Sequence, residues 1–262
     1  MSFSQALSGL SAQSESLNVI GNNIANSQTV GFKAGDALFA DVFAGANSKV
    51  GLGTRVSEVR QDFTDGGLKG TGSQLDLAIS GKGFFRLAEY SEDPPGTGNE
   101  EVFYSRNGQF TRDKDGYIVN ATGQYLTGDD GGNKADATDP LQIPEENGTD
   151  VKLIGFELQD DGSITANYND GSTLNKQINL ANFVNPEGLQ PVGDNNFKTT
   201  EASGNPDDGT LEANLGTPGT GTLGSLESGF VESSNVDLAT ELVDTIITQR
   251  AYQANSTSIS TQ

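Results

Sequence analysis

The two ends of the chain are patterned as helices, and the stretch between them is patterned as β-structure. Over about the first 30 residues, apolar side chains recur every seven residues, which aligns them in one narrow stripe on a helix. About the last 28 residues carry a second and wider stripe. The stripes consist of Phe3, Leu7, Leu10, Leu17, Ile20 and Ile24 at one end, and of Leu238, Leu242, Val243, Ile246, Ile247 and Ala251 at the other.

Neither terminal helix should be stable alone. Two glycines in the N-terminal segment each weaken a helix by about 1 kcal/mol relative to Ala, and we expect residues 21–27 to fray into a turn. At the C-terminal end, Ser234 or Asn235 is the expected N-cap, with Asp237 three residues after Ser234 in a capping-box-like arrangement. Such helices form when their apolar stripes find a partner.

The middle of the chain, from about Leu38 to Phe230, has the short apolar runs and turn residues of β-strands. Four Asn-Gly or Asp-Gly dipeptides predict hairpins, because both central positions of a type I′ turn need positive φ. These dipeptides are Asn107-Gly108, Asp115-Gly116, Asp161-Gly162 and Asp170-Gly171.

These patterns predict an α+β fold, in which paired N- and C-terminal amphipathic helices, arranged like a coiled coil, flank a β-rich middle domain. We expect residues 1–35 and 233–262 to form a terminal helical core domain. Residues 36–127 and 151–232 are expected to form the β-rich domain. Residues 128–150 are polar and rich in Gly, Asp and Thr, and are expected to be a linker.

Composition excludes several kinds of chemistry. The 262 residues include 36 acidic and 15 basic side chains, for a net charge of −21, and they include no Cys, His or Trp. There can be no disulfide, zinc–thiolate site or His-dependent triad, and we expect no catalytic residue, metal or cofactor. A strongly anionic surface repels nucleic acid and anionic lipid, so neither is an expected partner. No apolar run is long enough for membrane insertion, and the first residues lack the features of a cleaved signal peptide.

The two stripes suggest a polymer subunit. Two terminal helices that cannot bury their apolar sides alone gain most by pairing with each other and then packing against further copies. The alternative is an ordinary α+β domain, whose terminal helices cover one sheet. These two interpretations stay open on pattern alone.

Several motifs then resemble one family. Near the N-terminus the chain reads Asn22-Asn23-Ile24-Ala25-Asn26, followed by Gly31-Phe32-Lys33. These residues are similar to the N-terminal signature of the bacterial flagellar rod, hook and hook-associated axial proteins. Residues 76–85 and 105–110 resemble the middle motifs of that family, and residues 229–255 resemble its closing helix.

The resemblance implies a structural subunit of the flagellar hook, outside the cell. Such a subunit polymerises with copies of itself into a curved, flexible tube that acts as a universal joint. Its partners would be the flagellar rod, the hook cap, the hook–filament junction proteins and the type III export apparatus, which exports the chain unfolded without a cleaved signal. The terminal helices would line the channel and the β-rich domain would form an outer layer.

The chain differs from the usual hook protein in one respect, and this difference favours another branch of the same family. Hook proteins usually carry an additional outer β domain in mid-chain, where this chain has only residues 128–150. Distal rod subunits of the basal body lack that domain and are the alternative. The opening residues and residues 45–53 resemble the hook proteins more closely.

Other functional classes have weaker signals. The acidic pairs Glu92-Asp93 and Asp129-Asp130 could serve a carboxylate-based hydrolase, but solvated turns explain them better. Residues 113–116 lack the further ligands of a calcium loop and predict a turn. A secreted adhesin would explain the β-rich middle and leave the terminal helices without a role.

Overall fold

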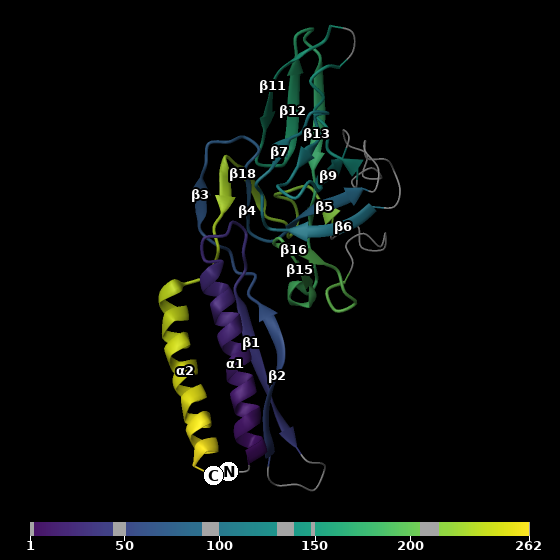
Figure 1. The fold of residues 1–262 in the computed structure, drawn as a ribbon. Coiled ribbons are helices and arrows are strands. Elements are labelled where there is room, and N and C mark those ends of the chain that lie inside the picture. Colours follow the sequence, from purple (N-terminus) through teal and green to yellow (C-terminus); the bar gives the residue numbers. More distant parts are fainter. Residues whose placement is uncertain are drawn as a thin grey trace. The chain divides into compact units, whose positions relative to one another are not determined.

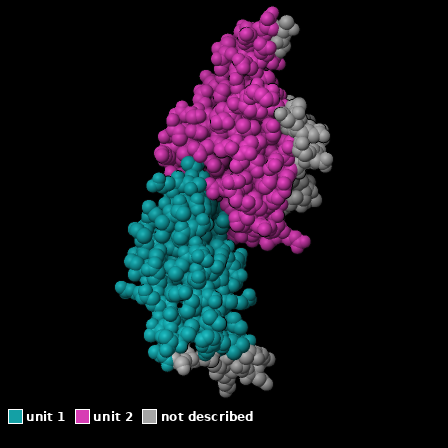
Figure 2. Space-filling model, viewed as in Figure 1, with its two compact units in different colours: residues 1–64, 234–262 teal, residues 65–233 magenta. Residues whose placement is uncertain are grey.

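The protein is described by a computed structural model. It describes residues 3–43, 51–90, 100–129, 139–147, 150–204 and 215–261. The chain forms two compact units: unit 1 comprises Met1–Thr64 and Ser234–Gln262, and unit 2 comprises Asp65–Ser233 (Figure 2). The domain boundaries expected from the sequence stay a prediction.

Unit 1 contains both helices and one β-hairpin. Helix α1 spans Phe3–Ala25, strands β1 and β2 span Gly35–Phe43 and Gly51–Gln61, and helix α2 spans Leu238–Ser260. The two helices lie side by side and run antiparallel (Figure 1). The hairpin lies along α1. Two terminal helices that flank a β-rich middle in the sequence confirm the α+β class.

The ends of the helices differ from the expectation. Helix α1 continues to Ala25 and the turn follows it, so the predicted fraying from residue 21 is wrong. The N-cap of α2 is Asp237, whose carboxylate accepts a hydrogen bond from the Ala239 N–H at 2.9 Å. Asn235 cannot serve as the cap because its side chain is used elsewhere, accepting from the Ala34 N–H at 2.8 Å and donating to the Asp62 carbonyl at 2.8 Å.

Unit 2 is built from short strands. The main sheet has the order β11-β12-β13-β9-β5-β6-β16-β15, and β4 pairs with β18 while β3 pairs with β19. Its elements are β3 (Leu68–Gly70), β4 (Leu77–Ser80), β5 (Phe84–Tyr90), β6 (Glu100–Ser105), β7 (Thr111–Arg112), β8 (Ile118–Val119), β9 (Tyr125–Asp129), β10 (Asp139–Pro140), β11 (Leu153–Leu158), β12 (Ser163–Tyr168), β13 (Thr173–Ile178), β14 (Leu180–Ala181), η2 (Pro186–Gly188), β15 (Gln190–Gly193), β16 (Asn196–Lys198), β17 (Leu215–Gly216), β18 (Ser225–Ser228) and β19 (Phe230–Glu232).

One hydrophobic core holds unit 2 together. Phe85, Leu87 and Leu126 are fully buried in it. The segment expected to be a linker also contributes, because Leu141 and Ile143 are 2% and 0% exposed. Within that segment, residues 130–138 and 148–149 lie outside the described residues, as do Glu92, Asp93 and Asp130 of the acidic pairs. Leu141 and Ile143 are therefore part of the folded core, whereas residues 145–147 are exposed.

The hairpin turns use a different chemistry from the one predicted. Among the described residues, the non-glycines with positive φ are Asp150, Asp194 and Asn195. The aspartates of the three Asp-Gly dipeptides therefore do not adopt a type I′ turn, and only their glycines have positive φ. Instead, the carboxylate of Asp161 accepts from both the N–H and the hydroxyl of Ser163, and these hydrogen bonds hold its pKa below the usual value.

The type I′ backbone appears at a position that the sequence did not indicate. Asp194 and Asn195, with φ of 53° and 59°, connect β15 to β16. The predicted hairpin at Asn107-Gly108 is wrong, because no pair of adjacent strands meets there in the described part of unit 2. Gly108 instead packs on the backbone of β4, and its carbonyl accepts from the Leu77 N–H at 2.9 Å.

We expect Gly108→Ala to destabilise unit 2 by about 3 kcal/mol or more, because a Cβ at this position would overlap the backbone oxygen of Leu77. Urea unfolding followed by tyrosine fluorescence measures this change. Gly155→Ala is the matched control, since open space surrounds that position and its stability should change by no more than about 0.5 kcal/mol. Equal stabilities of the two variants would contradict the packing described.

Candidate functional site

Helices α1 and α2 meet through small and polar groups. A Cβ added to Gly9 of α1 would lie 2.9 Å from the Asn255 Nδ2 of α2, so the glycine lets the two helices approach closely there. At the other end of the helix pair, the Asn23 Nδ2 of α1 donates to Glu241 Oε1 of α2 at 2.9 Å. Thr248, midway along α2, is the buried residue of that helix.

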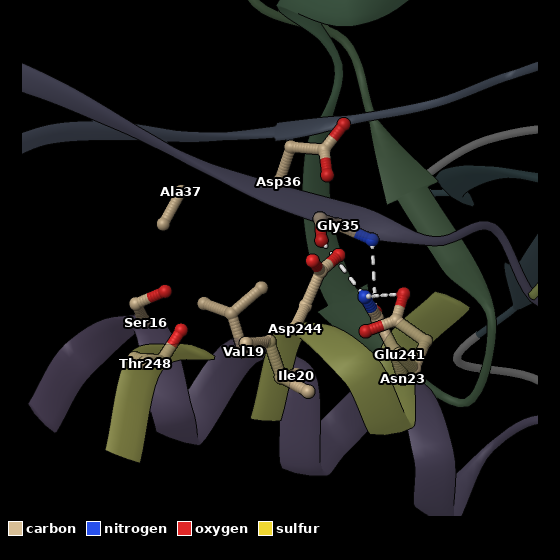
Figure 3. A pocket seen from close by; sticks show the side chains of 10 residues that line it. All are labelled: Ser16, Val19, Ile20, Asn23, Gly35, Asp36, Ala37, Glu241, Asp244 and Thr248. Carbon is tan, nitrogen blue, oxygen red and sulfur yellow. Dashed lines mark hydrogen bonds between the residues drawn. The ribbon is translucent and has the colours of Figure 1, made fainter. Parts of the chain in front are cut away.

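Asn23 connects three elements of unit 1 (Figure 3). Its Nδ2 also donates to the Gly35 carbonyl, and its Oδ1 accepts from the Gly35 N–H, each at 2.9 Å. The side chain is 2% exposed. One amide therefore joins α1 to the start of β1 and to the first turn of α2.

A small cavity of about 170 Å³ opens beside Asn23, between α1, β1 and α2 (Figure 3). Val19 and Ile20 supply part of its apolar wall. Asp36, Glu241 and Asp244 also line it. In the hairpin register, Arg60 on β2 lies opposite Asp36.

The environment of this cavity disfavours the charge on Glu241. Burial is the main cause that raises the pKa of Glu241, and the negative charges of Asp244 and Asp36 add to it. The hydrogen bond from Asn23 opposes the shift. The ionised carboxylate of Glu241 is therefore held in place at some cost to stability.

The remaining residues of the family signature build the turn after α1. Asn22 Oδ1 accepts from Asn26 Nδ2 at 2.8 Å, and Gly31 has a φ of 71°, which favours glycine. Lys33 is 2% exposed, and its Nζ donates to the Thr64 carbonyl at 2.7 Å. Ile24 and Phe32 are half-buried and Ala25 is exposed. The signature thus directs the chain from α1 into β1.

Among the described residues, most of the α2 stripe is exposed. Exposed fractions in this stripe are 43% for Leu238, 54% for Leu242 and Val243, 52% for Ile246 and 58% for Ile247, while Ala251 is half-buried. In the α1 stripe, Phe3 and Leu7 are 58% and 48% exposed, Leu10, Leu17 and Ile24 are half-buried, and Ile20 is buried. The α2 stripe is therefore not buried against α1, because the contacts between the helices use other faces.

The hairpin adds an apolar surface that sequence reasoning missed. The exposed large apolar residues of β1 and β2 are Leu38, Phe39, Phe43, Leu52 and Val59. Leu38 and Phe39 are adjacent in the sequence, and the register of the β1–β2 pair shifts between them. Their adjacency breaks the alternation of apolar and polar residues expected of a half-buried strand, and it is the signal that the sequence contains.

Charge is divided unevenly between the units. Unit 2 contains 28 of the 36 acidic and 10 of the 15 basic side chains, so its net charge is −18, and unit 1 has the remaining −3. The unit with the exposed apolar helix face is therefore close to neutral.

Metal binding has no supporting arrangement in the described ranges. No three Asp or Glu side chains there are placed to hold a metal ion. Residues 113–116 form a turn in which the Asp113 carboxylate accepts from the N–H groups of Asp115 and Tyr117 at 3.0 and 2.7 Å. The length and apolar character that a membrane span requires are found in neither described helix.

Comparisons with known proteins identify the class to which this chain belongs. Three family models match: "Flagella basal body rod protein" over residues 4–33, "Flagellar hook protein FlgE/F/G D1 domain" over residues 78–166, and "Flagellar basal body rod FlgEFG protein C-terminal" over residues 227–262.

Curated relatives include both hook and rod proteins. The chain is 33% identical to the flagellar hook protein FlgE of Escherichia coli K12 over 408 aligned positions, covering all of this chain and 97% of that protein. It is 36% identical to the flagellar basal-body rod protein FlgG of Buchnera aphidicola subsp. Schizaphis graminum over 271 positions, covering 97% and 92% of the two chains. The chain belongs to the flagellar rod and hook protein family. These relatives are structural parts of the flagellum and not enzymes.

We expect Glu241→Gln to stabilise unit 1 at pH 7 by on the order of 0.5 kcal/mol, because glutamine keeps the oxygen that accepts from Asn23 and removes the charge beside Asp244. A raised folded-state pKa contributes stability that is fully present below the unfolded pKa and is lost as the pH rises through the folded pKa. The advantage of the variant should therefore disappear on acidification. The partial positive charge at the N-terminus of α2 favours the carboxylate, which reduces the stabilisation expected for Glu241→Gln without cancelling it.

Thermal unfolding of the helical circular dichroism signal, followed between pH 4 and pH 8, measures this difference. Glu15→Gln, at an exposed position of α1, is the control and should change the pH profile little. A Glu241→Gln protein that is less stable than the parent at pH 7 would show that the carboxylate is favourably placed.

Proposed function

We propose that this chain is a structural subunit of the bacterial flagellar hook, which polymerises through unit 1 into a curved, flexible tube that links the rod to the filament. The exposed apolar face of α2 is the observation that carries the proposal. Five large apolar side chains between Leu238 and Ile247 are about half exposed on a helix whose partner contacts are made elsewhere.

The free energies of burial and association favour assembly through several surfaces together. Full burial of a large apolar side chain contributes about 1.5–3 kcal/mol, so covering the exposed half of each of five contributes roughly 5 kcal/mol in total. Association costs an estimated 4–15 kcal/mol in lost freedom of motion. The α2 face alone therefore supports weak association at most, and the exposed residues of the hairpin and of the first turns of α1 are needed as well.

The two units have different places in the proposed polymer. In it, the terminal helices pair in a coiled-coil-like arrangement with each other and with neighbouring copies and line a channel, and the β-rich domain forms the outer layer. The proposed partners are copies of this chain, the rod, the hook cap, the hook–filament junction proteins and the type III export apparatus. The proposed location is the extracellular hook, reached without a cleaved signal peptide, and no cofactor is involved.

A distal rod subunit of the basal body is the second candidate, favoured by alignment length. The alignment to the rod protein is close to the length of this chain, whereas the alignment to the hook protein contains many positions with no counterpart here. Expression in bacterial strains that lack either the hook protein or the distal rod protein tests the two. Restored hook formation in the first strain supports the hook proposal, and restored rod formation in the second supports the rod.

Replacing two residues of the α2 face tests the assembly surface. We expect Leu242→Ser/Ile246→Ser to raise the critical concentration for polymerisation at least about tenfold, with an unchanged monomer, because both side chains are more than half exposed. Sedimentation and electron microscopy measure tube formation. Val184→Ser in unit 2, where the parent side chain is 79% exposed, is the control and should assemble normally. Tubes formed equally well by the double variant would exclude this face.

Salt should strengthen the polymer. Neighbouring copies each bring a unit 2 of charge −18, and added salt screens their mutual repulsion. We expect the thermal stability of tubes to rise between 50 mM and 500 mM NaCl, measured by light scattering during heating. A constant or falling stability would show that the acidic side chains do not oppose assembly.

A further inference from the structure

Arg106 and Glu232 form an ion pair in the interior of unit 2. Their side chains are 3% and 1% exposed, and Arg106 Nη1 lies 3.4 Å from Glu232 Oε2. Arg106 Nη2 donates to the Gly81 carbonyl at 2.8 Å, and the guanidinium carbon lies 5.2 Å from the centre of the Phe84 ring. The guanidinium is therefore anchored to the loop between β4 and β5 and to the start of β5.

Glu232 ties together the first and the last residues of unit 2. Its Oε1 accepts from the Gly66 N–H at 2.8 Å, and the next residue, Ser233, donates its N–H to the Gly67 carbonyl at 2.8 Å. In the β3–β19 register, Leu68 lies opposite Glu232. The two chain segments at residues 65–68 and 231–233 therefore meet at one carboxylate.

Burial makes the pairing obligatory. Desolvation lowers the pKa of Arg106 from its ordinary value, and the charges of Glu232 and of the half-exposed Asp65, 3.6 Å away, oppose that shift. A guanidinium remains charged in proteins. A buried charge without its partner is strongly destabilising, whereas a pair replaced by apolar residues can be close to neutral. Of the two carboxylates, Glu232 is the buried one, so burial of the Arg106 charge depends mainly on Glu232.

Glu232 lies far from Arg106 in the sequence. It is 126 residues from Arg106 in the sequence and belongs to the last strand of unit 2. A contact between such distant residues forms only after a large loop has closed.

We propose that Arg106 is a positioning residue that makes closure of unit 2 conditional on β19, and that it acts by fixing Glu232 and thereby both ends of the unit. Until β19 is in place, Arg106 lacks its buried counter-charge and retains the solvent-exposed carboxylate of Asp65, 3.6 Å away, so unit 2 stays loosely folded. Once paired, the two residues hold β3 and β19 to the rest of the unit.

Hydrogen–deuterium exchange on the full-length chain tests this role. The informative amides are those of Thr71 and Ser233, which donate to the Gly229 and Gly67 carbonyls. We expect Arg106→Met and Glu232→Gln each to speed exchange at these amides by about a hundredfold, through opening of β3 and β19. Arg106→Lys should give an intermediate value, because it retains the charge and loses the forked geometry.

The double variant Arg106→Met/Glu232→Leu removes both charges of the pair. It therefore distinguishes the effect of an unpaired buried charge from the effect of losing the packing of these two side chains. If the pair acts as proposed, the exchange rates of these amides in the double variant lie within about tenfold of the parent's rates. The rates in each single variant are much higher. Arg112→Met is the control, since it breaks a more exposed pair with Glu145 at 3.9 Å, and it should leave these amides unchanged. Single variants that match Arg112→Met, or a double variant as unprotected as either single one, would overturn the proposal.

Discussion

Unit 1 depends on how its two helices contact each other. The hydrogen bond from Asn23 to Glu241 and the close approach of Gly9 to Asn255 fix α2 against α1 through polar and small groups. Polar pairing of this kind is directional, so it selects one rotation of α2 about its axis. In that rotation the large apolar side chains from Leu238 to Ile247 point away from α1. The exposed face of α2 is a consequence of this pairing, which leaves these apolar side chains in contact with solvent.

The division of charge complements the division of apolar surface. Neutral and apolar surfaces associate readily, whereas surfaces of the same high charge repel each other in proportion to their proximity. A chain with its apolar helix face in unit 1 and a charge of −18 in unit 2 combines attraction in one part with repulsion in the other. In the proposed polymer, such a balance would keep unit 2 of neighbouring copies apart while unit 1 packs.

Periodicity alone predicted the helices and the β-rich middle, because helices and strands have different spacings of apolar residues. The resemblance to a known family, and not periodicity, singled out Asn23 and Lys33, and it could not assign their roles, which depend on contacts with Gly35, Glu241 and Thr64. Periodicity could not predict that the α2 stripe is exposed. A stripe shows that a helix has an apolar side, whereas the polar contacts of the other side decide where that stripe faces. The turn at Asp194-Asn195 was missed because neither residue is a glycine.

Asn23, Lys33 and Asn235 have structural roles within unit 1. Asn23, Lys33 and Asn235 make hydrogen bonds to backbone groups within unit 1, at Gly35, Thr64, Ala34 and Asp62. Hydrogen bonds of this kind hold the shape of the helical unit, so these side chains do not by themselves distinguish a hook subunit from a rod subunit. If the chain polymerises as proposed, the difference must come from surfaces between copies. The exposed residues of the β1–β2 hairpin and the acidic surface of unit 2 are the places where a single chain can vary those contacts without disturbing its own fold.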